Sequence, residues 1–269
     1  MNYQEYLAPV LEISKKAGNA ILEIYQSDDF GARIKSDNSP LTEADLKSHH
    51  VIVDGLKALT PEIPVLSEES KGISFEQRNQ WNTFWLVDPL DGTKEFIARN
   101  DEFTTNIALV HNNKVILGVI YVPVLDTYYF ASKDHGAFKQ VGTDAAEKIS
   151  VRTVPVVNNE KHYTIVASRR HGLDKVQELC KKMPHFELAS RGSSLKMCLV
   201  AEGQADLYPR LAPTSEWDTA AAQIIVEEAG GELIKTDFSE FLYNTKEDLL
   251  NPHFYVLGDA SENWRELLS

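Results

Sequence analysis

Nine residues decide what this chain is predicted to be: Trp85-Leu86-Val87-Asp88-Pro89-Leu90-Asp91-Gly92-Thr93. The first three are apolar and predict a short buried strand, which ends where the first carboxylate appears. The next residues are typical of a turn, because Asp caps it, Pro presets φ and Gly accepts a positive φ. The stretch therefore predicts a strand that delivers two carboxylates to the surface of a folded domain.

The predicted turn gathers several oxygen atoms. Asp88 is the first polar residue after the strand, and Asp91 returns a second carboxylate to the same side. The Leu90 carbonyl adds an oxygen, Gly92 lets the backbone approach a ligand closely, and the Thr93 hydroxyl can position a water molecule. Such a set can hold two Mg²⁺ ions about 3.5–4 Å apart, the spacing used for in-line phosphoryl displacement. From these residues alone, a metal site and a plain turn are about equally supported.

Carboxylates recur at other places where a strand ends or a helix begins. Glu68 and Glu69 follow an apolar strand, Asp218 opens an Ala-rich helix, and Thr42-x-x-Asp45 opens another helix. Each has an ordinary explanation: a solvated pair for the glutamates, a helix cap for Asp218, and a capping box for Thr42 and Asp45. If they were gathered in one place, they would repel one another unless cations neutralised them. The functional interpretation depends on their joint occurrence.

Two kinds of segment follow each other along the chain. The first half has two amphipathic helices, over the first twenty-odd residues and 42–59, then strands at 63–67, 85–87, 104–111, 114–122, 128–132 and 137–141. The dipeptide Asn112-Asn113 predicts a hairpin. In the second half, strands at 163–167, 186–189, 206–208, 232–234 and 254–257 alternate with helices at 173–183, 194–202 and 218–229. The polar segment 142–160 lies between them, which predicts an α+β half at 1–155 packed against an α/β half at 156–269.

Composition limits the function classes. Of the 269 residues, 43% are hydrophobic, and the 40 acidic residues exceed the 27 basic ones by 13. This negative charge disfavours a nucleic acid polymer as partner, although a bound metal can still attract a small anion. The two cysteines, Cys180 and Cys198, are typical of a reduced cytosolic protein. We expect no signal peptide and no transmembrane segment.

Several catalytic motifs are missing from the sequence. It has no G-x-x-x-x-G-K-[ST] phosphate loop, no G-x-G-x-x-G and no G-x-S-x-G nucleophile elbow. A phosphatase with an aspartyl nucleophile would carry Asp-x-Asp-Gly-Thr, whereas Asp88 and Asp91 are three residues apart. This spacing argues against a covalent phospho-enzyme and favours attack by water.

Three motifs resemble the metal-binding motifs of the inositol monophosphatase superfamily. They are Pro64-Val65-Leu66-Ser67-Glu68-Glu69, the stretch 85–93, and Glu216-Trp217-Asp218-Thr219-Ala220-Ala221. Where inositol monophosphatases usually have Asn-Phe, this chain has Lys94-Glu95. That difference, together with 38–45, 192–196 and 198–210, resembles the 3'(2'),5'-bisphosphate nucleotidases of the bacterial CysQ type. The resemblance implies a layered α/β sandwich of the sugar-phosphatase type.

The resemblance also implies an activity and a division of roles. The reaction would remove the 3'-phosphate of adenosine 3',5'-bisphosphate, a by-product of sulfate activation, with two or three Mg²⁺ ions and with sensitivity to lithium. Metal ligands would be Glu68, Asp88, Asp91, Asp218 and the Leu90 carbonyl, several of which also contact substrate. Asp45 and Thr93 would orient and deprotonate the attacking water, and the Gly92-Thr93 backbone would bind the scissile phosphate.

The alternative is inositol monophosphatase or fructose-bisphosphatase-like activity at the same metal site. A degenerate sensor without activity is disfavoured, because both water activators are present.

A bisphosphate needs cations beyond the metals. Lys196 lies near the start of the helix opened by Gly192-Ser193-Ser194, where Ser194 is a further candidate contact, and we favour Lys196 as a phosphate ligand over a surface role. Arg210, Arg169 and His171 are further candidates. For His171 a surface role is equally supported, and the segment 168–171 departs mildly from relatives that carry a second Ser. We expect Arg191 at the surface, and Tyr208 and Trp217 in the core rather than under an adenine. A cytoplasmic location follows, with peripheral association at the inner face of the cell membrane and the oligomeric state left open.

Overall fold

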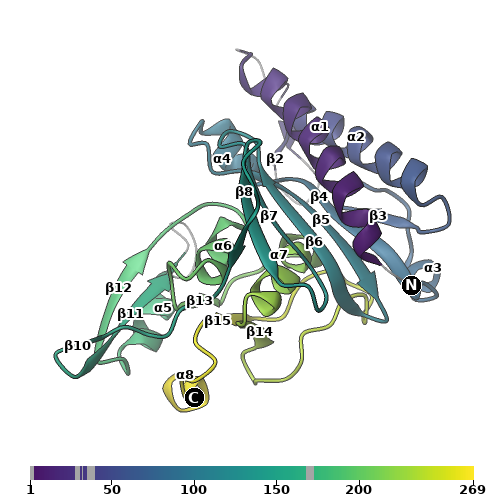
Figure 1. Cartoon of the computed structure of the whole chain (residues 1–269). Coiled ribbons are helices and arrows are strands. Elements are labelled where there is room, and N and C mark those ends of the chain that lie inside the picture. Colours follow the sequence, from purple (N-terminus) through teal and green to yellow (C-terminus); the bar gives the residue numbers. More distant parts are fainter. Residues whose placement is uncertain (1–2, 28–30, 32, 35–39, 168–172) are drawn as a thin grey trace.

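The computed structural model describes residues 3–27, 31, 33–34, 40–167 and 173–269, and its helices and sheets are stacked in layers (Figure 1). In order, the layers are helices α1 and α2, a first sheet, helices α6 and α7, a second sheet, and helices α5 and α8. This arrangement is the layered sandwich that was predicted.

The first sheet contains seven strands in the described part of the chain, in the order β3-β4-β5-β6-β7-β8-β9. They are β3 (Val65–Ser67), β4 (Thr83–Asp91), β5 (Thr104–His111), β6 (Lys114–Val122), β7 (Thr127–Ser132), β8 (Ala137–Val141) and β9 (Glu147–Ile149). Strands β3 and β4 are parallel, and all later neighbours are antiparallel, as predicted for a meander. Asn112 and Asn113 both have positive φ, which confirms the predicted hairpin.

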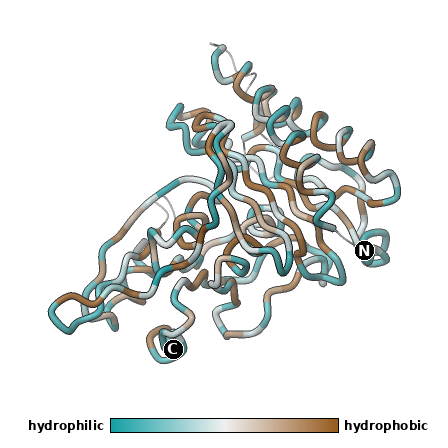
Figure 2. Tube along the Cα trace, viewed as in Figure 1, coloured by the Kyte–Doolittle hydropathy of each residue, from teal (hydrophilic) through white to brown (hydrophobic). Residues whose placement is uncertain are grey.

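Strand β4 is buried on both faces, which explains its unbroken apolar start. Trp85 and Val87 face helices α1 (Leu7–Tyr25) and α2 (Glu43–Leu59), whereas Phe84 and Leu86 face the opposite side. Figure 2 shows the corresponding concentration of hydrophobic residues along the strands of this sheet, with hydrophilic residues on the outer turns.

The second sheet follows the order β10-β11-β13-β15-β14, and β12 pairs with β11. Its strands are β10 (Val156–Val157), β11 (Glu160–Val166), β12 (His185–Ala189), β13 (Leu207–Arg210), β14 (Glu232–Lys235) and β15 (Phe254–Leu257). One face packs with the first sheet around α6 (Leu195–Ala201) and α7 (Glu216–Glu228), and the other packs on α5 (Leu173–Cys180) and α8 (Trp264–Leu268). Shorter described elements are η1 (Tyr3–Tyr6), β1 (Arg33–Ile34), β2 (Pro40–Leu41), α3 (Phe75–Arg78) and α4 (Thr93–Ile97).

The contact between the first sheet and α7 is very close. A Cβ atom added to Gly118 in β6 would lie 2.4 Å from the Ala221 carbonyl oxygen, so a side chain does not fit there. The alanines of α7 allow the same approach from the other side. This packing holds the first turn of α7, with Asp218, against the edge of the first sheet.

Some predicted element boundaries are wrong. The residues around Pro89 form a bulge inside β4 rather than a turn after it, because β5 pairs on both sides of them. Helix α7 begins at Glu216, two residues before the predicted start, because Ser215 is its N-cap. The polar segment 142–160 contains β9 and β10. The division into halves at 155 and 156 stays a prediction, as both sheets share one core around α7.

In the described residues, no helix has the length and apolar character needed to cross a bilayer. The segment 168–171, which includes the candidates Arg169 and His171, lies outside the described residues.

Candidate active site

The bulge in β4 determines where its two carboxylates point. Asp88 lies opposite Asn106 and Asp91 opposite Thr104, so β4 uses one residue more than β5 between these pairs. In a regular strand, residues three apart point to opposite faces; the extra residue places both carboxylates on one face. Pro89 is tolerated because the pairing with β3 ends at Val87.

Three carboxylates from distant parts of the chain meet at this edge. Asp88, Asp91 and Asp218 each offer an oxygen within 4.8 Å of the others. Glu68 adjoins them, since its backbone N–H donates to the Val87 carbonyl (3.0 Å), which places it beside Asp88. The structure thus gathers all four side chains predicted as metal ligands.

The carboxylates of the cluster raise one another's pKa. Burial raises the pKa of Asp88 well above its usual value, and the charges of Glu68 and Asp91 raise it further. Burial, followed by the charge of Asp91, raises the pKa of Asp218 to about 7. A hard divalent cation would remove this repulsion, and oxygen donors of this kind fit Mg²⁺.

Asp45 and Thr93 form a pair next to the cluster. The Thr93 hydroxyl donates to Asp45 Oδ1 (3.0 Å) and lies 3.4 Å from the Leu90 carbonyl oxygen. The other oxygen, Asp45 Oδ2, accepts from the backbone N–H and the hydroxyl of Thr42 (2.7 and 2.6 Å). Asp45 is therefore both the capping residue that its sequence predicts and a partner of Thr93. Burial raises the pKa of Asp45 above its usual value.

Gly92 connects the cluster to helix α4. Its φ is +93°, and a side chain there would crowd the Glu102 carbonyl and Ser193. Glycine is therefore required for the sharp step from β4 into the helix that begins with Thr93. The predicted contact of the Gly92 backbone with the scissile phosphate stays a prediction.

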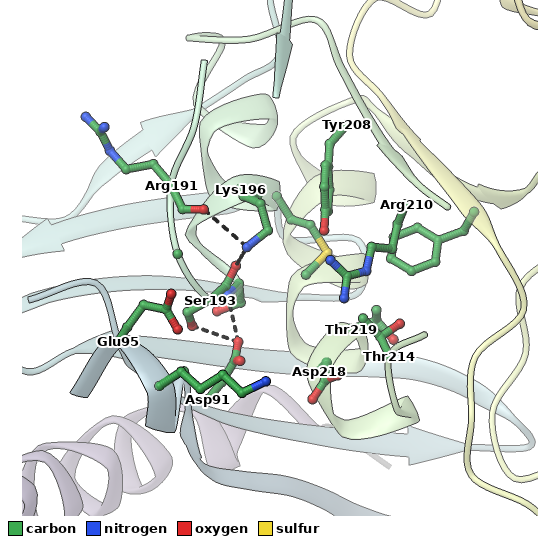
Figure 3. Close-up of a pocket in the computed structure, with 16 residues that line it drawn as sticks. Asp91, Glu95, Arg191, Ser193, Lys196, Tyr208, Arg210, Thr214, Asp218 and Thr219 are labelled. Carbon is green, nitrogen blue, oxygen red and sulfur yellow. Dashed lines mark hydrogen bonds between the residues drawn. The ribbon is translucent and has the colours of Figure 1, made fainter. Parts of the chain in front are cut away.

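A cleft opens beside Asp91 and Asp218, and cationic side chains line its far wall (Figure 3). Lys196 is 8% exposed and donates to the Ser193 carbonyl (2.6 Å) and, more weakly, to that of Arg191 (3.3 Å). Burial lowers its pKa to about 8. Arg210 donates to the carbonyls of the segment 212–213 and also lines the cleft.

Two residues predicted at the surface and in the core are found there, and both also line the cleft. Arg191 is exposed, as expected, and it also lines the cleft. Tyr208 is buried in the core between the sheets, as predicted, and yet also forms part of the cleft wall. Trp217 packs against the core as predicted. A strand-end position in the sequence does not reveal which of its side chains border an opening.

Comparison with known proteins places this geometry in a family. The model of the inositol monophosphatase family matches residues 2–265, nearly the whole chain. The chain belongs to the inositol monophosphatase family.

Relatives within the family indicate to which branch of the family the chain is related. A protein of Salmonella typhimurium named 3'(2'),5'-bisphosphate nucleotidase CysQ is 44% identical over 93% of this chain and 98% of its own. One of the same name from Haemophilus influenzae is 41% identical over 98% and 97%. The crystal structure of CysQ from Bacteroides thetaiotaomicron, 44% identical, aligns over 96% of this chain and 98% of its own with a TM-score of 0.82. These similarities confirm the predicted fold class, family and CysQ-type branch, and they agree with the predicted nucleotidase activity.

This member of the family also has site residues that the sequence did not reveal. Asp91 Oδ2 accepts from the Ser193 hydroxyl (2.7 Å), from the Ser194 backbone N–H (2.7 Å) and from Asn106 Nδ2 (3.4 Å). Ser194, predicted as a substrate contact, thus binds Asp91 in this structure. The hydroxyl of Thr104 joins both serines. Polar residues in a strand have no motif of their own, so only the pairing of β5 with β4 could have pointed to Thr104 and Asn106.

Proposed function

We propose that this protein is a Mg²⁺-dependent 3'(2'),5'-bisphosphate nucleotidase that converts adenosine 3',5'-bisphosphate to AMP and phosphate. The observation that carries the proposal is the convergence of Asp88, Asp91 and Asp218 beside the Asp45–Thr93 pair, with cations across the same cleft. The names of the CysQ relatives support the choice of substrate.

The metal site would consist of Glu68, Asp88, Asp91, Asp218 and the Leu90 carbonyl. Bound Mg²⁺ would neutralise phosphate charge and make a water molecule more acidic. The chain's own contribution is a set of oxygens in fixed orientations. Leu90 N donates to Asp88 Oδ1 (3.1 Å), and Ser215 N donates to Asp218 Oδ2 (2.9 Å). Each of these two carboxylates is thereby held in place through one of its oxygens. We propose two or three ions, as in the resemblance.

Asp45 and Thr93 would carry the proton of the attacking water. The single proton of the Thr93 hydroxyl points to Asp45 Oδ1, so the Thr93 oxygen is left to accept from water. As the water oxygen bonds to phosphorus and the bond to the 3'-oxygen breaks, one water proton would pass to Thr93 and the Thr93 proton to Asp45, while the departing 3'-oxygen would take a proton from solvent to become the 3'-hydroxyl. The raised pKa of Asp45 favours this uptake.

The second phosphate would lie on the cationic wall. Lys196 and Arg210 line the cleft that begins at Asp91 and Asp218, so one molecule can reach metals and cations together. His171 stays a predicted contact, and the Gly92-Thr93 backbone stays the predicted site for the scissile phosphate. We expect Lys196→Gln to raise KM for adenosine 3',5'-bisphosphate far more than for 3'-AMP, which lacks the 5'-phosphate.

The test is phosphate release by purified protein with and without Mg²⁺. We expect release from adenosine 3',5'-bisphosphate that stops with excess EDTA and is nearly abolished by Asp91→Asn. Asp144→Asn, an exposed change in the loop between β8 and β9, is the matched control and should leave the rate unchanged. Robust activity in excess EDTA would contradict the proposal. Faster phosphate release from inositol 1-phosphate or fructose 1,6-bisphosphate would show that the proposed substrate is wrong and that the proposed metal site is right.

The proposed activity also implies a cellular role. Adenosine 3',5'-bisphosphate is a by-product of sulfate activation, so the enzyme would serve sulfur metabolism in the cytoplasm. We further propose inhibition by lithium, which would replace one Mg²⁺ among the carboxylates.

A further inference from the structure

The carboxylate of Asp91 is held by residues from both parts of the fold. Its own strand β4 belongs to the first sheet, whereas Ser193 and Ser194 precede helix α6 between the sheets. Thr104, which pairs with Asp91 across β4 and β5, is fully buried beneath both serines. The metal cluster and the 191–194 turn therefore meet at this one side chain.

The three hydroxyls and Asn106 form one hydrogen-bond network behind Asp91. The Ser193 hydroxyl donates to Asp91 Oδ2 (2.7 Å), and the Thr104 hydroxyl lies 2.6 Å from that of Ser193. The Thr104 hydroxyl also lies 2.8 Å from that of Ser194, and both Thr104 and Ser194 donate to Asn106 Oδ1 (3.0 Å each). The Nδ2 group of the same amide donates to Asp91 Oδ2 (3.4 Å), so the network converges on this carboxylate oxygen, and connected hydrogen bonds of this kind strengthen one another.

The 191–194 turn has a strained backbone conformation at Ser193, the residue that contacts Asp91. Ser193 has a φ of +51°, a left-handed conformation that a residue with a side chain adopts only when its surroundings impose it. Gly192 is packed so closely that an added Cβ would lie 2.7 Å from Glu95 and 2.8 Å from the Glu102 carbonyl. Its N–H also donates to the Glu102 carboxylate (2.8 Å). The strained backbone is thus fixed in the one arrangement that turns Ser193 toward Asp91.

We propose that Ser193 and Thr104 are positioning residues that orient Asp91 for the metal. This inference rests on the proposed function, in which Asp91 is a ligand. Three donors occupy Asp91 Oδ2, which leaves the other oxygen in a fixed direction for a cation. Hydrogen bonds behind a metal ligand typically change metal affinity or activity by about 10- to 100-fold.

The chain provides a matched pair of substitutions in adjacent residues of β5. Thr104→Val removes the hydroxyl that supports Ser193. Thr105→Val is the same isosteric change on a residue whose buried hydroxyl has no hydrogen-bond partner among the described residues. Thr104→Ser keeps the hydroxyl and serves as the conservative rescue. Two further variants, Ser193→Ala and Ser193→Gly, remove the donor itself, and glycine adopts a positive φ without strain.

The readout is the dissociation constant for Mn²⁺ as a stand-in for Mg²⁺, measured by electron paramagnetic resonance on metal-free protein without substrate. We expect Thr104→Val, Ser193→Ala and Ser193→Gly each to weaken binding by about 10-fold or more. Thr104→Ser and Thr105→Val should bind as the wild type does. The concentration of Mg²⁺ that gives half-maximal activity should shift in parallel, with kcat largely recovered at saturating Mg²⁺.

Wild-type Mn²⁺ affinity in the Thr104→Val and Ser193→Gly proteins would overturn the inference, as would equal losses in Thr104→Val and Thr105→Val. If Thr104→Val does not fold, Ser193→Gly decides, because it removes the hydroxyl and relieves strain. A wild-type protein that binds Mn²⁺ but releases no phosphate would refute the proposed function, and the ratios of Mn²⁺ affinity would still judge the positioning role. A wild-type protein without Mn²⁺ binding would refute both.

Discussion

The N-termini of helices α2 and α7 are built from the same motif and face different partners. Thr42 with Asp45, and Ser215 with Asp218, are both capping boxes in which the third residue of the helix is an aspartate. In each, one carboxylate oxygen caps the helix. The remaining oxygen of Asp45 accepts from Thr93, whereas Asp218 faces Asp88 and Asp91. A cap therefore leaves one carboxylate oxygen for another partner, and we infer that the neighbours decide whether this oxygen takes up a proton or binds a metal.

The largest effect should come from Asp218→Asn. Asparagine keeps an oxygen for the Ser215 N–H, so the cap should survive, but the charge that binds the cation is lost. Losing several kcal/mol of electrostatic stabilisation of the transition state should lower kcat/KM by about 1,000-fold. Phosphate release at fixed Mg²⁺ measures it, and thermal unfolding checks that the helix is intact. Activity within tenfold of the wild type would show that Asp218 is only a cap.

Asp45→Asn should act on kcat instead. Loss of the group that takes up the proton is expected to lower kcat by about 100- to 10,000-fold, with KM little changed. The matched comparison is Thr93→Ser, which keeps the hydroxyl, against Thr93→Val, which does not. If Thr93→Val were as active as Thr93→Ser, the proton path through Thr93 would be wrong.

The metal-free protein should respond to pH in a direction set by the carboxylate cluster. The pKa of Asp218 is raised from 3.8 to about 7, so between these values the folded chain holds a proton that the unfolded chain has released. Stability without metal should therefore fall as pH rises from 4 to 7. Because Mg²⁺ competes with that proton, its stabilising effect on Tm should be larger at pH 8 than at pH 6. In Asp218→Asn this difference should shrink; an equal Mg²⁺ effect at both pH values in the wild type would contradict the account.

The smallest effects should come from the N-caps themselves. Thr42→Ala and Ser215→Ala each remove one capping hydroxyl and should cost about 1 kcal/mol of unfolding free energy. Urea denaturation measures this cost. Thr42→Ala should also lower kcat modestly, because the Thr42 hydroxyl fixes the second oxygen of Asp45. A loss of activity as large as that of Asp45→Asn would mean that Thr42 does more than cap.

Much of the fold and part of the site could be predicted from local sequence. The hairpin at Asn112-Asn113 follows from turn chemistry, and the carboxylates that meet in the cluster were found through their motifs. Pro89 predicts a turn although it lies in a bulge, because turns and bulges favour the same residues and only the pairing with β5 separates them. Ser193 and Thr104 act through contacts between residues 89 positions apart, which no local pattern encodes.

The most direct measurement is a calorimetric titration of Mg²⁺ into metal-free Asp45→Asn and Asp218→Asn proteins, side by side with the wild type. If Asp45 takes up the proton and Asp218 binds the metal, Asp45→Asn should bind Mg²⁺ with near wild-type affinity and yet release almost no phosphate. Asp218→Asn then shows severely weakened binding. Equal Mg²⁺ affinity in both variants would contradict the account.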